Sequence, residues 1–142
     1  MKTLALNEKS LSYNSVDDRD IFSIIKAIKT GIKFSVFTTI AQNSPFSLNE
    51  WAAFLNISER TMQRYKKEKR AFDADSSEKI IEITLLYKYG IEVFGNKEKF
   101  NSWLETKNVA LGSIVPKELL DNTFGINLLK DELTRIEYGI LA

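Results

Sequence analysis

The stretch SLNEWAAFLNISERTMQRYKK, residues 47–67, predicts two short helices joined by a tight turn. Ser47 and Glu50 have the spacing of a capping box, in which the serine side chain bonds the glutamate amide and the glutamate side chain bonds back, so a helix begins here. Ser58 is placed to cap a second helix, which we expect to run to about Arg70. This arrangement indicates a helix-turn-helix.

The residues at the crossing and in the turn meet the requirements of that motif. Ala52 supplies the small side chain that is needed where the two helices cross. Asn56 stands where glycine is usual, and asparagine is the next best residue for a left-handed backbone. Ile57 is the apolar plug of the turn, and Met62 and Tyr65, three apart on the second helix, are expected to face inward.

The outward face of the second helix carries groups suited to the major groove of DNA. Arginine binds guanine through two hydrogen bonds, glutamine binds adenine in the same way, and lysine neutralises phosphate. Residues 58–72 contain six basic and two acidic side chains. A solvated basic helix in an ordinary bundle would show the same composition, so that alternative stays open. The predicted DNA-contacting residues are Ser58, Arg60, Thr61, Gln63, Arg64 and Lys67.

The remainder of the chain has apolar residues at helical spacing, interrupted by only two prolines and six glycines, and predicts an all-α fold. Residues 1–16 lack periodicity and are expected to form a flexible tail. Asp17 is a good helix cap, and Gly31 a good stop for that first helix. The apolar positions of the first two helices are Ile21, Ile25 and Ile28, then Phe34, Phe37 and Ile40.

After a polar connector at Asp73 to Ser77, a long helix carries apolar residues on more than one face. Such a helix must be buried on more than one side, so we expect it to join two halves of the protein or to pack against a second subunit. Its main apolar face is formed by Ile80, Ile83, Tyr87, Ile91 and Phe94.

A loop from Asn108 to Asn122 is expected to contain one helical turn at Pro116 to Leu120, because proline favours the first helical position. The last helix places Ile126, Leu129, Leu133 and Ile136 on one face. The sequence therefore predicts a helix-turn-helix domain at 17–75, followed at 76–142 by the connecting helix and a small helical C-terminal domain.

The composition narrows the classes of function. The chain of 142 residues has no cysteine and no histidine, which removes thiolate metal sites, disulfides and the commonest general base. We expect no enzyme, no metal, no cofactor and, without a long apolar run, no membrane segment. Residues 1–72 hold 12 basic and 7 acidic side chains, whereas residues 73–142 hold 8 and 12. The basic half suits a polyanion, and the protein is expected to be cytoplasmic.

Several segments resemble one family of bacterial regulators. Residues 57–66, ISERTMQRYK, are similar to the recognition helix of Xre-type antitoxins. The C-terminal half resembles the toxin-binding domain of the Xre/MbcA/ParS antitoxins through EVFGN at 92–96, WL at 103–104, ALG at 110–112, VPKELL at 115–120, TFG at 123–125 and LTRIEYG at 133–139. The sequence departs from the family pattern at Tyr65, Lys79 and Asn108.

This resemblance implies a non-catalytic antitoxin of a type II toxin-antitoxin module. Its partner would be a RES-domain toxin that consumes NAD⁺, neutralised when the C-terminal domain covers the active-site cleft, and the antitoxin would repress its own operon. A one-component helix-turn-helix repressor, with a C-terminal domain for dimerisation or sensing, is the alternative. A homodimer is expected in either case, because two recognition helices about 34 Å apart read a palindromic site.

The family resemblance directs the choice of toxin-binding residues to the C-terminal half and above all to its end. Ile140 and Leu141 are apolar beyond a helix stop, where they either fold back onto their own core or meet a partner. The predicted toxin contacts are Trp103, Leu111, Pro116, Arg135, Glu137, Tyr138, Ile140, Leu141 and Ala142.

Overall fold

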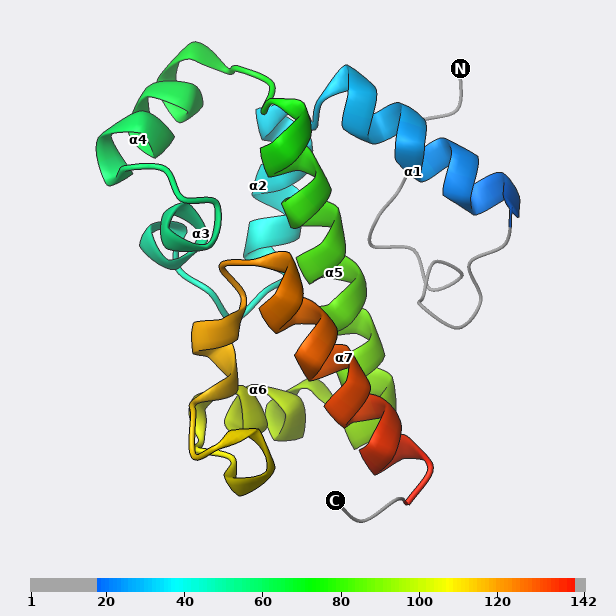
Figure 1. Ribbon diagram of the computed structural model, residues 1–142. Coiled ribbons are helices and arrows are strands. Elements are labelled where there is room, and N and C mark those ends of the chain that lie inside the picture. The colour runs from blue at the N-terminus through cyan, green and yellow to red at the C-terminus, as the bar shows by residue number, and fades with distance from the viewer. Residues whose placement is uncertain (1–17, 140–142) are drawn as a thin grey trace.

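A computed structural model describes residues 18–139 and confirms the all-α class (Figure 1). Within this range, β-pairing is limited to two isolated bridges, Lys33 with Ala71 and Asn108 with Ile114. The tail predicted at 1–16 and the cap Asp17 lie outside the described residues. The α-helices are α1 (Asp18–Thr30), α2 (Phe34–Gln42), α3 (Leu48–Phe54), α4 (Glu59–Glu68), α5 (Ala74–Phe94), α6 (Lys97–Glu105) and α7 (Thr123–Glu137), with 3-10 turns η1 (Val109–Leu111) and η2 (Pro116–Leu119).

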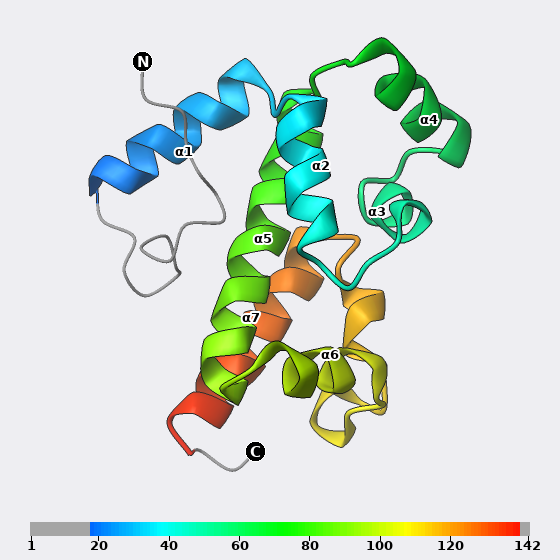
Figure 2. The same cartoon turned by 180° about the vertical axis from the view of Figure 1, so that it is seen from behind.

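Helix α5 is the axis of the molecule and packs against α1, α6 and α7 (Figures 1 and 2). Ile80, Ile83 and Leu86 are at most 1% exposed, and they contribute to one continuous core with residues from both halves. The prediction that this helix joins the two halves is confirmed. Tyr87, Ile91 and Phe94, further along α5, are only half-buried, and a contact of this helix with a second subunit stays a prediction.

The first turn of α5 replaces the polar connector predicted at Asp73 to Ser77. Asp73 is the cap, and its carboxylate accepts a 2.8 Å hydrogen bond from the Ser76 amide. Ser77 is fully buried, where its hydroxyl accepts a 2.8 Å bond from the Ile32 amide. These serines therefore serve helix capping and domain packing, and the predicted boundary between 75 and 76 falls inside a continuous helix.

Helix α1 is packed on a face that only partly matches the predicted one, with Ile28 common to both. Ile24, Ala27 and Ile28 lie against the core, whereas Ile21 and Ile25 are 44% and 41% exposed. Phe22 is 72% exposed. The apolar arc of this helix is therefore wider than the surface that α5 covers.

The C-terminal domain is built where α6, η2 and α7 meet α5. Ile126, Leu129 and Leu133 are fully buried on α7, as predicted, but Ile136 in its last turn remains 38% exposed. The predicted turn at Pro116 is present as η2. A further turn, η1, was missed because a short side-chain bond creates it: the Asn108 carboxamide oxygen accepts from the Ala110 amide at 2.8 Å.

Candidate functional site

The helix-turn-helix forms through the local bonds that its sequence predicts. The Ser47 hydroxyl accepts from the Glu50 amide at 3.1 Å, and the Glu50 carboxylate accepts from the Ser47 amide at 3.0 Å, which completes the capping box. Trp51 and Ala52 on α3 are each 1% exposed. This small, buried alanine allows α4 to cross α3 closely.

The turn between α3 and α4 has the predicted left-handed residue. Asn56 has a φ of 58°, and the Ile57 amide closes the turn on the Ala52 carbonyl at 3.0 Å. The Ser58 hydroxyl then accepts from the Thr61 amide at 3.0 Å and begins α4. The direction in which α4 leaves α3 is thus set by three adjacent residues.

Helix α4 divides into a packed face and an exposed basic face. Met62 is 1% exposed, and Tyr65 is half-buried with its ring 5.4 Å from that of Phe72. The opposite face follows i, i+3, i+4, i+7 spacing, so its side chains project in one direction. Its four exposed members, called the α4 basic face below, are Arg60, Gln63, Arg64 and Lys67.

Ser58 and Thr61, also predicted to contact DNA, form hydrogen bonds with each other at the start of α4. The Ser58 hydroxyl lies 2.9 Å from the Thr61 hydroxyl, and Thr61 is half-buried. Among residues 18–139, one ion pair involves α4 or the two residues after it. The Arg70 guanidinium lies 3.9 Å from the Glu68 carboxylate. The charges of the α4 basic face are therefore not neutralised inside the described chain and are available to an anionic partner.

Three of the predicted toxin contacts support the C-terminal domain from within. Leu111 is 7% exposed and Pro116 is buried. Trp103 is half-buried and stacks on Phe100 with ring centroids 5.8 Å apart. These side chains have little surface to offer a partner, because the core already covers most of it.

The C-terminal end of α7 is partly engaged as well. Arg135 bonds the buried Glu132 at 2.9 Å, and Glu137 accepts from the Tyr89 hydroxyl at 2.9 Å. Tyr138 is 69% exposed. The predicted contacts Ile140, Leu141 and Ala142 lie outside the described residues.

The structure reveals a face on α7 of which the predicted toxin contacts included Arg135 and Tyr138 but missed the apolar part. Phe124 is 88% exposed and Leu128, one turn further on, is 43% exposed. Helical periodicity places exposed Asp131, half-buried Arg135 and exposed Tyr138 on the same side. We call the set Phe124, Leu128, Asp131, Arg135 and Tyr138 the α7 face. The sequence contains a sign of this face. At helical spacing, Phe124 and Leu128 fall on the side of the helix opposite the apolar positions Ile126, Leu129 and Leu133.

A close approach at the start of α7 explains the outward direction of Phe124. A Cβ atom on Gly125 would lie 2.1 Å from the Leu119 carbonyl oxygen, so only glycine fits against η2. The helix rotates by about 100° per residue, which turns the neighbouring Phe124 away from η2. Val109 on η1 is another large apolar side chain of this domain that is left exposed, at 86%.

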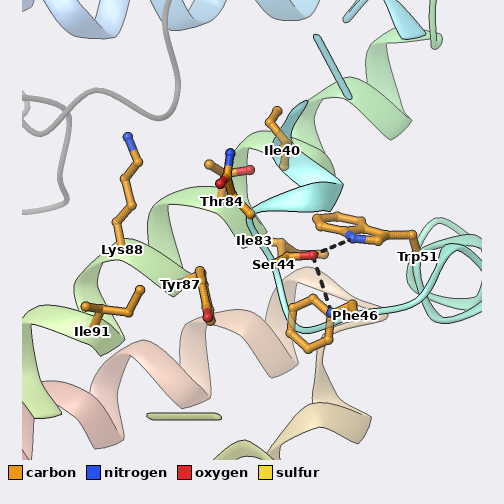
Figure 3. A pocket seen from close by; sticks show the side chains of 10 residues that line it. Ile40, Ser44, Phe46, Trp51, Ile83, Thr84, Tyr87, Lys88 and Ile91 are labelled. Carbon is orange, nitrogen blue, oxygen red and sulfur yellow. Dashed lines mark hydrogen bonds between the residues drawn. The ribbon is translucent and has the colours of Figure 1, made fainter. Parts of the chain in front are cut away.

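A pocket of about 290 Å³ lies between the loop after α2 and the middle of α5 (Figure 3). Its wall is mainly apolar, and several of its polar groups are already bonded inside the chain. The Ser44 hydroxyl accepts from the Trp51 indole at 3.1 Å, the Thr84 hydroxyl donates to the Ile80 carbonyl at 2.7 Å, and Tyr87 donates to Asn101. These three hydroxyl groups of the lining are thus already used within the fold.

Among residues 18–139, no cluster of acidic side chains could hold a metal ion. No helix in this range is long and apolar enough to cross a membrane. The two surfaces that stand out are therefore the α4 basic face and the α7 face.

Comparison with known proteins agrees with this division. The domain described as "Antitoxin Xre-like helix-turn-helix domain" matches residues 23–84, and the domain described as "Antitoxin Xre/MbcA/ParS C-terminal toxin-binding domain" matches residues 90–139. The α4 basic face lies in the first match and the α7 face in the second.

Two curated relatives carry the name Antitoxin Xre. The protein from Photorhabdus laumondii subsp. laumondii is 25% identical over 116 residues, which cover 81% of this chain and 78% of the relative. The protein from Yersinia enterocolitica serotype O:8 / biotype 1B is 24% identical over 120 residues, which cover 84% and 81%. With two adjacent domains of one family in the expected order, the chain belongs to the Xre family of antitoxins.

Proposed function

We propose that the protein neutralises a RES-domain, NAD⁺-consuming toxin through the α7 face and represses its own operon through the α4 basic face. The observation that carries this proposal is the presence of both exposed faces on one chain, each inside the matching domain of the antitoxin family. The protein acts in the cytoplasm by binding and not by catalysis.

The DNA-binding part of the proposal rests on chemistry and exposure. Arg60, Gln63 and Arg64 project from the first six residues of α4, and the N-terminal part of a recognition helix is the part that meets base edges. Lys67 is one turn further along, where it is suited to a backbone phosphate. Arg64 also lies 6.0 Å from the Tyr65 ring, a contact that limits the directions in which the guanidinium can point.

The toxin-binding part rests on two exposed apolar side chains at the start of the α7 face. An exposed phenylalanine has little reason to face water unless a partner covers it, and aromatic anchors dominate protein interfaces. Phe124 and Leu128 are the proposed anchors, with Asp131 and Arg135 beside them for polar contacts. Tyr138 extends the face toward the C-terminal residues 140–142, which we keep as proposed contacts.

We further propose that the protein is a homodimer, because a single recognition helix contacts too few base pairs for useful affinity. Since much of α5 is covered within the chain, the proposed contact is the uncovered side of α1, formed by Ile21, Phe22 and Ile25. Light scattering should show a dimer for the wild type and a monomer for Phe22→Glu. Ser23→Glu, on the opposite side of α1, should remain dimeric, and a monomeric wild type would contradict the proposal.

The decisive experiment for the whole function is co-purification of the tagged chain with the product of the neighbouring gene. We expect a stable complex with a RES-domain protein, loss of its NAD⁺ consumption in the complex, and rescue of growth in cells that express it. A chain that shifts operator DNA but binds no neighbouring product would favour the one-component repressor instead.

A further inference from the structure

A short segment of the C-terminal domain, residues 117–121, holds helix α3 near both of its ends. At the first end, the Lys117 ammonium lies 2.6 Å from the Glu50 carboxylate and 2.6 Å from the Glu105 carboxylate. Glu50 uses its other oxygen to cap α3. One lysine therefore joins η2, α6 and the first turn of α3.

At the second end, the backbone carbonyl of Asp121 receives two side-chain donors. The Asn56 carboxamide donates at 3.3 Å and the Lys79 ammonium at 2.8 Å. Asn56 is the left-handed residue of the turn, two positions before the Ser58 cap that begins α4. The C-terminal domain is thus bonded to the residue that sets the direction of the DNA-reading helix.

Two attachments constrain orientation in a way that one cannot. Helix α3 is seven residues long, or about 10 Å at 1.5 Å per residue, so its ends are well separated. A single bond would fix only one end beyond what the packing of Trp51 and Ala52 already fixes, since the hydrophobic effect itself is non-directional. Bonds at both ends define where α3 points, and through the tight turn they define where α4 points.

The charges at the first attachment support a real ion pair. Hydrogen bonds to Glu105 and Glu50 raise the pKa of Lys117. Partial burial alone would raise the pKa of Glu50, but its hydrogen bonds from Lys117 and from Ser47 outweigh burial and hold the pKa below the usual value. Both partners are therefore charged at neutral pH.

From this arrangement we infer that Lys117, a residue of the toxin-binding domain, is a positioning residue for DNA recognition. It acts through Glu50 on the orientation of α3 and α4. The hydrogen bond from Asn56 to Asp121 is the second attachment, at the other end of α3. The inference rests on the proposed DNA binding and adds a requirement: the helix-turn-helix reads its operator at full affinity only when the C-terminal domain holds it.

A lysine beside a DNA-binding helix could instead contact a phosphate directly, and the two roles give different salt dependence. Loss of a phosphate contact reduces the slope of log affinity against log salt by about one, whereas loss of positioning leaves the number of phosphate contacts unchanged. Positioning also affects specific binding more than non-specific binding, because only base readout needs exact alignment.

The test compares Lys117→Met with Lys107→Met, a matched control in which an exposed lysine outside α4 is removed with the same change of charge. Affinities for operator DNA and for a scrambled duplex are measured at several salt concentrations on the full-length chain. For Lys117→Met we expect operator affinity to fall about three- to five-fold, the range that a partly exposed ion pair can contribute, with an unchanged salt slope and unchanged scrambled-DNA affinity. Lys117→Arg should recover part of the loss, and Lys107→Met should match wild type.

Two results would overturn the positioning role. One is an operator affinity of Lys117→Met that stays within two-fold of wild type at every salt concentration, and the other is a reduced salt slope for that variant. If that variant loses helicity by circular dichroism, Asn56→Gly decides, because glycine keeps the left-handed turn while removing the bond to Asp121. It should weaken operator binding with unchanged slope, and wild-type affinity would overturn the inference. A wild-type chain that does not prefer operator over scrambled DNA would instead refute the DNA-binding part of the proposed function.

Discussion

The Tyr89 hydroxyl on α5 donates a 2.9 Å hydrogen bond to the Glu137 carboxylate at the end of α7. Tyr89 is 1% exposed, and its hydroxyl also lies 3.1 Å from the Thr134 hydroxyl. The two longest helices are therefore tied together close to the C-terminal end of the described chain. Glu137 has a role in the fold, while its neighbour Tyr138 stays exposed.

The hydrogen bond between Tyr89 and Glu137 is kept in one truncated protein and lost in another. Removing residues 140–142 leaves it intact, so the fold should persist while toxin neutralisation is lost. Deleting from Arg135 onward also removes Glu137 and Ile136, and should lower the free energy of unfolding by about 1–3 kcal/mol. Growth of toxin-expressing cells and circular dichroism check both variants. Full protection by the chain lacking 140–142 would show that these residues are dispensable.

Replacing Arg64 with alanine should weaken operator binding by about 1–3 kcal/mol, because a two-bond contact to guanine is lost. Folding and toxin neutralisation should not change, since the side chain is exposed and lies outside the toxin-binding domain. Electrophoretic shifts at several salt concentrations measure the effect, with Lys97→Ala on α6 as the control. Equal shifts for Arg64→Ala and wild type would mean that α4 is not the reading helix.

Replacing Phe124 with serine should weaken the toxin complex strongly without loss of stability, because the ring is 88% exposed. Removal of an aromatic anchor at an interface costs about 2 kcal/mol or more. Ile126→Ala, two residues away and fully buried, should instead destabilise the protein by about 2–5 kcal/mol. Calorimetric titration with toxin and urea unfolding separate the two effects. Unchanged toxin affinity in Phe124→Ser would remove the α7 face from the proposal.

Replacing Gly90 with alanine should lower the free energy of unfolding by about 1–3 kcal/mol through overpacking. A Cβ atom there would lie 2.1 Å from the far end of the Phe100 ring, which fills the space beside the glycine. Phe100→Leu combined with Gly90→Ala should lose less stability than the sum of the single variants, since the smaller side chain makes room. Thermal unfolding of wild type, the two single variants and the double variant measures this coupling. If the stability losses of the single variants simply add, the contact between Gly90 and Phe100 does not cause the loss.

The pair Lys117 and Glu50 should stabilise the protein within a defined pH window. Glu50 has a lowered pKa, so its contribution is complete above its ordinary value of 4.5 and is lost as pH falls through the lowered value. Lys117 has a raised pKa, so its contribution is complete below 10.5 and is lost as pH rises through the raised value.

Urea unfolding of wild type and Lys117→Met across pH measures this contribution. The two should differ by about 0.5–1 kcal/mol at neutral pH, as for a partly exposed pair, and converge in acid. The capping bond from Ser47 to Glu50 is present in both proteins, so the difference isolates the lysine. A difference that persists unchanged at about pH 2, where carboxylates are protonated, would exclude the ion pair as its cause.

The sequence by itself determined the helix-turn-helix in detail. The capping box at Ser47, the left-handed Asn56, the cap Ser58 and the division of α4 into packed Met62 and an exposed basic face were all predictable. Each depends on residues within one or two turns of each other, where steric limits and hydrogen-bonding geometry act without help from the rest of the chain.

Only the tertiary structure decided which residues of the C-terminal domain are available to a partner. Leu111 and Pro116 are buried while Phe124 is exposed, although all three are apolar residues of family-like segments. Burial depends on which elements meet, and here a glycine contact between α7 and η2 turns Phe124 outward. The bond from Lys117 to Glu50 spans 67 positions and was equally invisible, because no local spacing encodes a contact that exists only after two domains pack together.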